Sequence, residues 1–430
     1  MQTLMRKITE RSAHVSVIGL GYVGLPLAIE FARSGYRVIG IDTDPDKVAG
    51  INASQSHVQD VSHAELRQIV ENGQLRATDD FAVLAEVDTV SICVPTPLSK
   101  SKDPDISYIV KVTEAIRKHL HPMQLIVLES TTYPGTTDEV ILPQMQATGL
   151  QLGKDFFLAF SPERIDPGNK MFQLKNTPKI IGGVTAKCTR VAKHLYQQII
   201  DTVVPMSSSR AAEMVKLLEN TFRAVNIGLV NEVALMCDRL GLDVWEVIDA
   251  AATKPFGFMP FYPGPGLGGH CIPLDPHYLA WKLKTLDYRA RFIELADDIN
   301  TRMPHYVVSR ISDVLNEVCK SIKGSKILVL GIAYKSDTND IRESPALEVI
   351  RLLHTKGSEV FFHDPFITEV PGLQYTDLTE RMLNWADCVV ITTNHSVYDY
   401  RWVAEQSKLI VDTRNATRDV KKGRDKIHKL

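Results

Sequence analysis

Residues 14–45 read HVSVIGLGYVGLPLAIEFARSGYRVIGIDTDP, and this stretch decides the fold. A short β-branched run is followed by clustered glycines, then by a helical pattern, and then by a second apolar run. That order predicts a βαβ unit, in which a helix joins two parallel strands. Apolar runs at 89–94, 125–128, 157–159 and 179–181 are separated by segments of helical length and extend the pattern. We therefore expect a largely parallel sheet that binds ligands at the carboxyl ends of its strands.

A second stretch, 325–365, repeats the order of strand, glycine, helix, strand and Asp-Pro. It keeps Gly331 but has Ala333 and Tyr334 where close backbone approach would be needed, so we expect this half not to bind its own dinucleotide. Between the two lies a long, almost strand-free helical pattern over 210–252. The chain of 430 residues is too long for a single core. The predicted fold class is α/β, with two Rossmann-like domains that have parallel sheets and are joined by a long-helix central domain, with boundaries at 1–205, 206–310 and 311–430.

Composition excludes several classes of protein. The formal net charge is -2, with 49 basic and 51 acidic residues, so no long-range field favours nucleic acid or an anionic membrane as a partner. The six cysteines are scattered singly without a CxxC pair or a histidine at zinc spacing, and we expect no metal. Residues 1–13 are polar and lack a secretory signal pattern, while 15–29 is interrupted by glycines and a proline and is too short to span a membrane. These features predict cytoplasmic residence with reduced thiols.

The glycines at 19, 21 and 24 match the dinucleotide fingerprint, in which they permit a tight turn, close approach of a pyrophosphate and close packing of helix on strand. An ordinary glycine-rich turn is the alternative reading. Asp42 ends the next strand, where its carboxylate would bind the adenosine ribose and repel a 2'-phosphate, so NAD is expected rather than NADP. A turn-forming role for Asp42 is compatible with this. The cofactor-binding residues expected here are Gly19, Gly21, Tyr22, Val23, Gly24, Asp42 and Lys47.

Two further strand ends should line the same crevice. One carries Pro95 and Thr96, and the other carries Thr131. Each of these segments could instead serve only to form a turn. For Thr131 we favour a functional hydroxyl, because the segment 129–137 places several polar groups at one strand end.

The loop 268–276 reads GGHCIPLDP and closes a turn-rich stretch that begins at 253. A lone cysteine is usually part of a core. Cys271 instead stands between two glycines and an acid on a loop that neither helix nor strand can cross, which favours a nucleophile.

The chain resembles the UDP-glucose/GDP-mannose dehydrogenase family along essentially its whole length. The motifs that carry the resemblance are GLGYVG (19–24), STTYPGT (130–136), SPERIDPG (161–168), EMVKLLENTFRAVNIGLVNE (213–232), GGHCIPLDP (268–276) and YKSDTNDIRESPA (334–346). Within the family, GGHCIPLDP and SPERIDPG are most similar to the branch that acts on UDP-N-acetylhexosamines. UDP-N-acetylglucosamine is the expected substrate, with UDP-N-acetylgalactosamine and UDP-glucose as alternatives.

The resemblance implies two successive oxidations at the sugar C6, each delivering a hydride to one NAD. A thiohemiacetal and then a thioester form on Cys271, and water hydrolyses the thioester to a uronic acid used in surface polysaccharide synthesis. A thiolate adduct would hold an aldehyde that could otherwise escape.

Other site residues take their roles from the same resemblance. Lys216 and Asn220 lie four residues apart on a predicted helix and would stabilise negative charge on the sugar oxygen, although a solvated helix edge is the alternative. Asp275 would help with proton handling. Glu163 would be the base for thioester hydrolysis, with Thr131 ordering the water, or would only position basic partners.

Positive charge for a sugar diphosphate is expected from Lys335 and Arg414 at the substrate, with Arg342 near the cofactor. The UDP-glucose branch carries an arginine ahead of the cysteine loop that reaches a neighbouring subunit's sugar, whereas 254–263 reads KPFGFMPFYP here. This difference fits an acetamido group against an aromatic surface. The further substrate-binding residues expected are Glu163, Arg164, Lys216, Asn220, Tyr262 and Gly268.

Two other readings compete with this one. The β-hydroxyacid dehydrogenases share an NAD domain followed by helices, but they lack a covalent cysteine. In a protein that senses NAD without catalysis, no function would explain the presence of Cys271, Lys216, Asn220 and Asp275. The apolar positions of the long helical region predict a homodimer or a higher oligomer, as the resemblance also implies.

Overall fold

The computed structural model describes residues 1–58, 60–99, 102–165, 171–269 and 271–430. The end of the SPERIDPG motif, from Asp166, and His270 of the cysteine loop lie outside these ranges. The chain forms two compact units: unit 1 comprises Met1–Glu219 and His277–Tyr288, and unit 2 comprises Asn220–Pro276 and Arg289–Leu430. Two helices, α8 (Ser209–Leu240) and α10 (Asp275–Lys284), begin in one unit and end in the other.

Unit 1 is built on a largely parallel sheet. Its other elements are α1 (Gln2–Thr9), β1 (His14–Ile18), α2 (Gly24–Arg33), β2 (Arg37–Ile41), α3 (Pro45–Asn52), α4 (His63–Glu71), β3 (Leu75–Thr78), η1 (Phe81–Glu86), β4 (Thr89–Ile92), α5 (Ser107–His119), β5 (Gln124–Leu128), η2 (Thr137–Ile141), α6 (Leu142–Gln146), β6 (Phe156–Phe160), β7 (Lys179–Gly183), α7 (Ala186–Tyr196) and β8 (Val203–Pro205). Within the described residues the strand order is β3-β2-β1-β4-β5-β6-β7-β8, and only the pair β6 and β7 is antiparallel. The expectation of a largely parallel sheet is confirmed.

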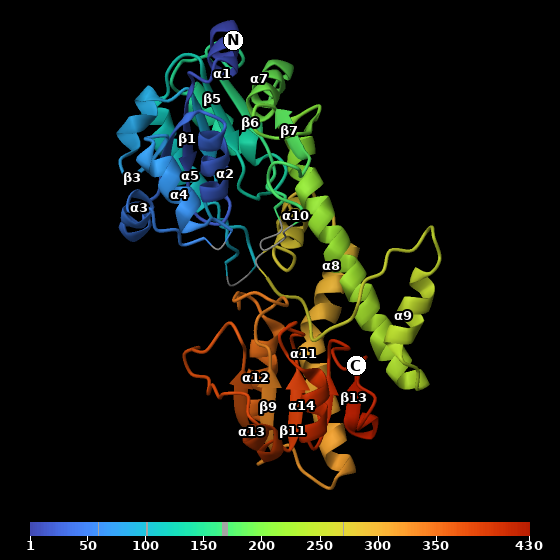
Figure 1. Cartoon of the computed structure of the whole chain (residues 1–430). Helices are drawn as coiled ribbons and strands as arrows, with labels where there is room; N and C mark the ends of the chain where they lie inside the picture. The colour runs from blue at the N-terminus through green and yellow to red at the C-terminus, as the bar shows by residue number, and fades with distance from the viewer. Residues whose placement is uncertain (59, 100–101, 166–170, 270) are drawn as a thin grey trace. The chain divides into compact units, whose positions relative to one another are not determined.

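Both faces of this sheet are buried. Along β5, Leu125 and Val127 pack into one apolar cluster, while Ile126 and Leu128 pack into another on the opposite face. Helices cover both faces, as Figure 1 shows for the blue to green part of the chain. This is why the strands read as continuous apolar runs rather than as alternating ones.

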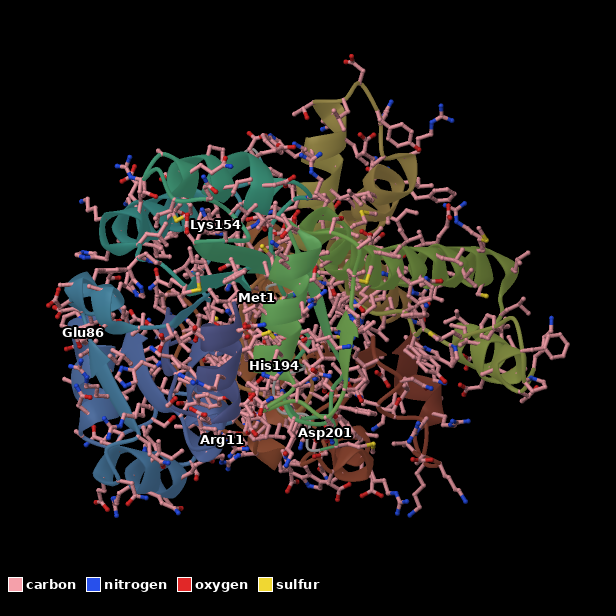
Figure 2. The ribbon with its side chains drawn as sticks, turned by 90° about the horizontal axis from the view of Figure 1, so that it is seen from above. Met1, Arg11, Glu86, Lys154, His194 and Asp201 are labelled. Atoms are coloured by element: carbon pink, nitrogen blue, oxygen red, sulfur yellow. The ribbon has the colours of Figure 1, made fainter. Side chains whose placement is uncertain are left out.

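The amino-terminal helix α1 lies beside α7. Oγ1 of Thr9 is 2.9 Å from Nε2 of His194, and the hydroxyl of Tyr36 donates to the carbonyl of Ile8 at 2.7 Å. Figure 2 shows α1 next to α7, with His194 labelled. Because Leu4 and Ile8 are buried, α1 is anchored by its apolar face.

The chain direction across the sheet reverses beside β1. From β1 the chain runs through β2 to β3 on one side, and then returns to β4 and β5 on the other. At such a switch point the loops after the two adjacent strands separate and leave a crevice. The loops after β1 and β4 are those that carry Gly19 and Pro95.

Unit 2 contains a second parallel sheet, with strand order β10-β9-β11-β12-β13 among the described residues. Its elements besides parts of α8 and α10 are α9 (Val244–Ala252), α11 (Arg291–Glu317), β9 (Lys326–Leu330), α12 (Pro345–Thr355), β10 (Glu359–His363), α13 (Glu380–Trp385), β11 (Cys388–Ile391), α14 (Tyr400–Gln406), β12 (Ile410–Asp412), η3 (Arg424–Lys426) and β13 (Ile427–Lys429). The predicted fold class, two Rossmann-like sheets with long helices between them in the chain, is confirmed. No helix in the described ranges is long and apolar enough to cross a membrane.

Candidate functional site

The turn after β1 has the geometry that a dinucleotide needs. Gly19 adopts a φ of +89°, which an L side chain rarely adopts, and a Cβ there would lie 2.5 Å from the carbonyl oxygen of Cys93. A Cβ on Gly24, the first residue of α2, would lie 1.8 Å from the carbonyl oxygen of Gly19. A Cβ on Gly21 would meet nothing within 4 Å. Gly19 and Gly24 therefore serve the fold, whereas Gly21 keeps open the space in front of the amino end of α2.

This difference predicts opposite results for two substitutions. Gly24→Ala should lower the free energy of unfolding by about 3 kcal/mol, because its methyl group collides with rigid backbone. Gly21→Ala should change that free energy by less than about 0.5 kcal/mol. It should weaken NAD binding about tenfold or more, because its methyl group takes the space of the pyrophosphate. Thermal unfolding and NAD titration of both variants check this. A stable Gly21→Ala protein with unchanged NAD affinity would contradict the assignment.

Asp42 directly follows β2, and Lys47 lies in the first turn of α3. The Asp42 carboxylate accepts the backbone N–H of Leu20 at 2.8 Å and that of Asp44 at 3.0 Å. Asp44 begins α3 by capping it, because its side chain accepts from the backbone of Asp46 and Lys47. Nζ of Lys47 lies 4.0 Å from the Asp42 carboxylate. The open turn, the helix amino end and the carboxylate together fit NAD.

The other strand ends of unit 1 carry the polar groups expected there. Thr96 is buried, and its carbonyl accepts a hydrogen bond from the hydroxyl of Tyr278 at 2.6 Å. Thr131 is half-buried, while its neighbour Thr132 is buried with its hydroxyl 2.6 Å from that of Thr136. The structure thus leaves Thr131 as the more accessible hydroxyl of this loop.

Lys216 and Glu163 meet in unit 1. Lys216 is only 9% exposed, and its Nζ donates to the backbone carbonyl of Glu163 at 2.7 Å. Within the described ranges no carboxylate pairs with this ammonium. The Glu163 carboxylate accepts the backbone N–H groups of Arg164 and Ile165 through Oε1, and its buried Oε2 has no hydrogen-bond partner among the residues that the structure describes. A buried cation that contacts a carbonyl but no carboxylate, and a buried carboxylate oxygen without a hydrogen bond, are costly, and both are suited to a ligand.

Arg164 is engaged by protein groups instead. Its guanidinium donates to both carboxylate oxygens of Glu219 and, at 2.7 Å, to the carbonyl of Pro178. The proposed substrate role of Arg164 would require some of these bonds to be replaced.

Sequence reasoning overlooked Glu213, which lies one turn before Lys216 on α8. Its fully buried carboxylate accepts from the backbone N–H of Gly135 at 2.6 Å and from the backbone and hydroxyl of Thr137 at 2.9 and 2.7 Å. Burial raises the pKa of Glu213. This carboxylate ties α8 to the loop that follows Thr131. The signal that could have identified Glu213 in the sequence is an acidic residue within the apolar helical pattern of α8.

A buried ion pair between Glu129 and Lys179 was also overlooked. Nζ of Lys179 lies 2.7 Å from the Glu129 carboxylate, which also accepts the hydroxyl of Tyr196. Burial raises the pKa of Glu129, and the Glu129 carboxylate raises the pKa of Lys179 although burial opposes it. Because β7 runs antiparallel to β6, its first residue, Lys179, lies at the edge where β5 and β6 end. The sequence did not reveal this ion pair, because the pair depends on the direction in which β7 runs.

In unit 2, Cys271 is exposed at the turn that leads into α10. Its carbonyl accepts the backbone N–H groups of Leu274 at 3.1 Å and Asp275 at 2.8 Å. Asp275 is buried, and its carboxylate accepts a hydrogen bond from Nδ2 of Asn220. The structure thus brings Asn220, Cys271 and Asp275 together, while Lys216 lies one turn before Asn220 on α8.

The glycines before Cys271 are explained by close packing inside unit 2. A Cβ on Gly268 would lie 2.6 Å from Cβ of Tyr334, and one on Gly269 would lie 2.7 Å from its ring. The backbone N–H of Gly269 donates to the carbonyl of Arg342 at 3.0 Å. The loop therefore lies against the segment that carries Lys335 and Arg342.

Tyr262 lies earlier in the same turn-rich stretch. Its hydroxyl donates to Asp249 at 2.8 Å, and its ring stacks on Trp245 with centroids 5.7 Å apart. Tyr262 remains 45% exposed, so one ring face stays open to a ligand or a partner.

The expected cations of unit 2 differ in their surroundings. Arg342 is exposed and forms an ion pair with Asp340 at 2.6 Å. Lys335 is half-buried on the loop after β9. Arg414 follows β12, and its Nε donates to the carbonyl of Thr392 at 3.0 Å. Burial lowers the pKa of Arg414 to about 10, so it remains a cation at neutral pH. Among the described residues no carboxylate forms an ion pair with it.

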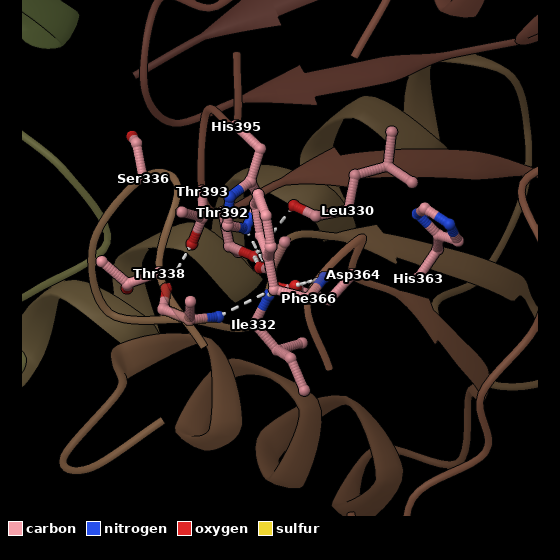
Figure 3. Close-up of polar contacts among 12 residues, drawn as sticks. Leu330, Ile332, Ser336, Thr338, His363, Asp364, Phe366, Thr392, Thr393 and His395 are labelled. Carbon is pink, nitrogen blue, oxygen red and sulfur yellow. Dashed lines mark hydrogen bonds and ion pairs between the residues drawn. The ribbon is translucent and has the colours of Figure 1, made fainter. Parts of the chain in front are cut away.

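At the switch point of the second sheet, between β9 and β11, polar protein groups bond to one another (Figure 3). Asp364 follows β10 as Asp42 follows β2, and it accepts the backbone N–H of Ile332 at 2.8 Å. It also accepts from Nε2 of His395 at 3.0 Å, and both side chains are fully buried. Nδ1 of His395 accepts the backbone N–H of Asp337 at 2.9 Å. The hydrogen bonds of Asp364 therefore stabilise the fold of this loop. The Asp42 side chain, by contrast, is only half-buried.

Comparison with known proteins gives consistent matches. Three parts of the UDP-glucose/GDP-mannose dehydrogenase family match the chain: the NAD binding domain at residues 13–200, the central domain at 210–302 and the UDP binding domain at 328–419. UDP-N-acetyl-D-mannosamine dehydrogenase from Pyrococcus horikoshii is 37% identical over 413 residues, which is 94% of this chain and 96% of that protein.

Two further matches agree with this. UDP-N-acetyl-D-glucosamine 6-dehydrogenase from Pseudomonas aeruginosa is 34% identical over 387 residues, 90% of this chain and 88% of that protein. The solved structure of the Pyrococcus horikoshii UDP-D-ManNAc dehydrogenase aligns with a TM-score of 0.88 and 34% identity, over 97% of this chain and 99% of that one. The three family regions contain every motif quoted from the sequence.

Proposed function

The chain belongs to the UDP-glucose/GDP-mannose dehydrogenase family and is an NAD-dependent oxidoreductase acting on CH–OH groups, and we propose that it oxidises C6 of a UDP-N-acetylhexosamine to a carboxylate. The observation that carries the substrate class is the similarity, over about nine-tenths of each chain, to relatives named for UDP-N-acetylmannosamine and UDP-N-acetylglucosamine. Two NAD molecules are consumed for each sugar.

NAD is held by the turn from Gly19 to Gly24 and by Asp42. The amino end of α2 receives the pyrophosphate, and Asp42 receives the adenosine ribose. Bound there, NAD supplies the hydride acceptor for both oxidations. The residues of this chain contribute binding, charge stabilisation and proton transfer.

Cys271 carries the covalent chemistry. Loss of a hydride and a proton from the C6 alcohol gives an aldehyde, to which the Cys271 sulfur adds as a thiohemiacetal. Loss of a second hydride and proton gives a thioester on Cys271. Water then breaks the C–S bond, which yields the carboxylate and returns the thiol. Exposure of Cys271 at the start of α10 supports this role, because a structural cysteine is usually buried.

Lys216 and Asn220 stabilise the oxyanion of the thiohemiacetal. Lys216 is a buried ammonium that contacts a carbonyl rather than a carboxylate, so its charge remains available to a ligand. Asn220 is held by Asp275, which handles the proton. Glu163 removes a proton from the hydrolytic water, with Thr131 as the group that orders the water. The buried oxygen of Glu163 that lacks a partner supports this assignment.

Arg414 and Lys335 bind the diphosphate of the nucleotide sugar. Arg414 lies at the carboxyl edge of the second sheet, where parallel sheets bind ligands. Its guanidinium is partly withdrawn from solvent and forms no ion pair within the described ranges, which is costly until an anion arrives. A diphosphate suits the planar guanidinium, which can donate two parallel hydrogen bonds.

UDP-N-acetylglucosamine is the first candidate substrate. The aromatic stretch 254–263, with the half-open ring of Tyr262, lacks an arginine and offers an apolar surface for an acetamido methyl group. UDP-N-acetylmannosamine is the second candidate, because the 37% identical relative bears that name.

A homodimer is proposed through α8. This helix exposes large apolar side chains at spacings of three to four residues and their multiples, which place them on one side of the helix: Leu218, Phe222, Leu229, Met236 and Leu240. A contiguous apolar surface of this kind is rare on monomers.

The test is the yield of NADH per sugar. Purified protein is mixed with NAD and, separately, UDP-N-acetylglucosamine, UDP-N-acetylmannosamine, UDP-N-acetylgalactosamine and UDP-glucose. We expect two NADH per acetamido sugar, and a kcat/KM at least about tenfold above that for UDP-glucose, since a mismatched C2 group leaves contacts unmade. One NADH per sugar would indicate an aldehyde or ketone product. Turnover of UDP-glucose alone would overturn the substrate class, and no NADH with any sugar would favour an NAD-binding protein without catalysis.

A further inference from the structure

A buried pair of amides joins α8 to α11 in unit 2. Nδ2 of Asn231 donates to Oδ1 of Asn300 at 2.8 Å, and Nδ2 of Asn300 donates to the carbonyl of Ala224 at 3.2 Å. Asn231 is 0% exposed and Asn300 is 3% exposed. Amides between packed helices cost free energy that apolar side chains would avoid. The pair therefore requires an explanation other than helix packing.

The remaining oxygen of the pair holds the glycine-rich loop. Oδ1 of Asn231 accepts the backbone N–H of Gly264 at 3.0 Å. Gly266, two residues later, also rests on α11, because a Cβ there would lie 3.2 Å from the carbonyl oxygen of Asn300. The amide of Asn231 thus holds this loop directly, and Asn300 supports it through its hydrogen bond to Asn231 and through its own backbone.

Gly264 in turn rests on the guanidinium of Arg414. A Cβ on Gly264 would lie 2.5 Å from Nη1 and 3.0 Å from Cζ of Arg414. From the sheet, the carbonyl of Thr392 accepts the Nε–H of Arg414 at 3.0 Å. The guanidinium is therefore confined between the backbone of Gly264 and the loop that follows β11.

We propose that Asn231 is a positioning residue of the nucleotide-sugar site, which fixes the guanidinium of Arg414 through the backbone of Gly264. This inference rests on the proposed role of Arg414 in binding the diphosphate. An arginine side chain has many rotamers, and restricting them before the ligand arrives lowers the entropy lost on binding. Asn231 accomplishes this without touching the substrate, because its amide orders the loop against which the arginine packs.

The experiment is a double-mutant cycle on the full chain, with UDP itself as the probe. Asn231→Ala is expected to weaken UDP binding about tenfold, while NAD affinity stays unchanged. Arg414→Ala weakens UDP binding at least as much. The double variant should bind UDP no more weakly than Arg414→Ala alone, because Asn231 acts through Arg414. The matched control is Asn226→Ala, since Asn226 lies on the same helix and its amide donates to the carbonyl of Phe222, one turn earlier in that helix.

Two further variants separate positioning from stability. Asn231→Asp is expected to restore UDP affinity to within about threefold of the parent, since a buried carboxyl is protonated and keeps an acceptor for Gly264 and a donor for Asn300. Gly264→Ala leaves α8 and the amide pair intact but pushes its methyl group onto Nη1 of Arg414. It should therefore reproduce the loss of UDP affinity, and it should have no effect in the Arg414→Ala background.

The outcomes distinguish this inference from the proposed function. Unchanged UDP binding in Arg414→Ala would overturn the diphosphate site and the inference with it. Weaker UDP binding in Arg414→Ala, combined with unchanged binding in Asn231→Ala and Gly264→Ala, would overturn the inference alone. Additive losses in the double variants would also overturn it, because they would show that Asn231 acts independently of Arg414.

Discussion

Replacement of Cys271 by alanine is expected to lower kcat for uronate formation by about a thousandfold or more. The loss is large because the second oxidation requires a carbon centre that bears both a hydrogen and an oxyanion, and addition of the Cys271 sulfur to the aldehyde creates that centre. Without the sulfur the aldehyde is held only by non-covalent contacts. The first oxidation remains possible, so at most one NADH per bound sugar should form.

The measurement is NADH release under steady-state and single-turnover conditions, with the uronate quantified separately. Cys319→Ala is the matched control, because Cys319 is also an exposed cysteine of unit 2 and lies outside the proposed site. Its kcat should equal that of the parent protein. Two NADH per sugar at the parental rate in Cys271→Ala would exclude a covalent role for this cysteine.

Lys216→Met is expected to lower kcat by about a hundredfold to a thousandfold, with little change in NAD affinity. Methionine has a similar length and tolerates burial, so the effect should come from the lost charge rather than from a cavity. The ammonium of Lys216 is held by the Glu163 carbonyl, and a developing oxyanion would be its strongest partner. The effect should therefore appear mainly in kcat rather than in KM.

Kinetics of Lys216→Met are compared with those of Lys118→Met. Lys118 is exposed in the last turn of α5, away from the carboxyl edge of the sheet. That control should retain parental kcat, and both variants should unfold at temperatures within a few degrees of the parent protein. A kcat for Lys216→Met within about threefold of the parent would remove Lys216 from the charge-stabilising role.

Much of the architecture was predictable because the signals are local. The apolar run before Gly19 and the helical pattern after Gly24 indicate strand and helix through their own spacing. The positive φ of Gly19 and the collision expected at a Cβ of Gly24 are consistent with the fingerprint read from the sequence. The exposure of Cys271 likewise agrees with its place on a loop rich in proline and glycine.

Other features of the candidate site could not be predicted from spacing. Glu213 and Thr137 are 76 residues apart in the chain, yet their hydrogen bonds fix α8 against the loop of Thr131. Arg164 occurs in a motif that indicates substrate binding, but its guanidinium contacts Glu219, 55 residues away. No local pattern reports such partners, because they are chosen by the packing of whole helices.

The sequence by itself determined most of the elements, their largely parallel arrangement and the identity of the chemical groups, because backbone preferences and hydrophobic periodicity act between near neighbours. Only the tertiary structure decided which groups are available. Asp42 and Asp364 follow equivalent strands, yet Asp364 is enclosed by His395, which is 31 residues away. Asn231 and Asn300 are 69 residues apart, and they form a hydrogen-bonded pair only because α8 packs on α11. The backbone of Gly264, which Asn231 holds, lies against the guanidinium of Arg414. The physical reason is that burial and hydrogen-bond geometry arise where two surfaces of the folded chain pack together. A single segment of the sequence contains only one of those surfaces.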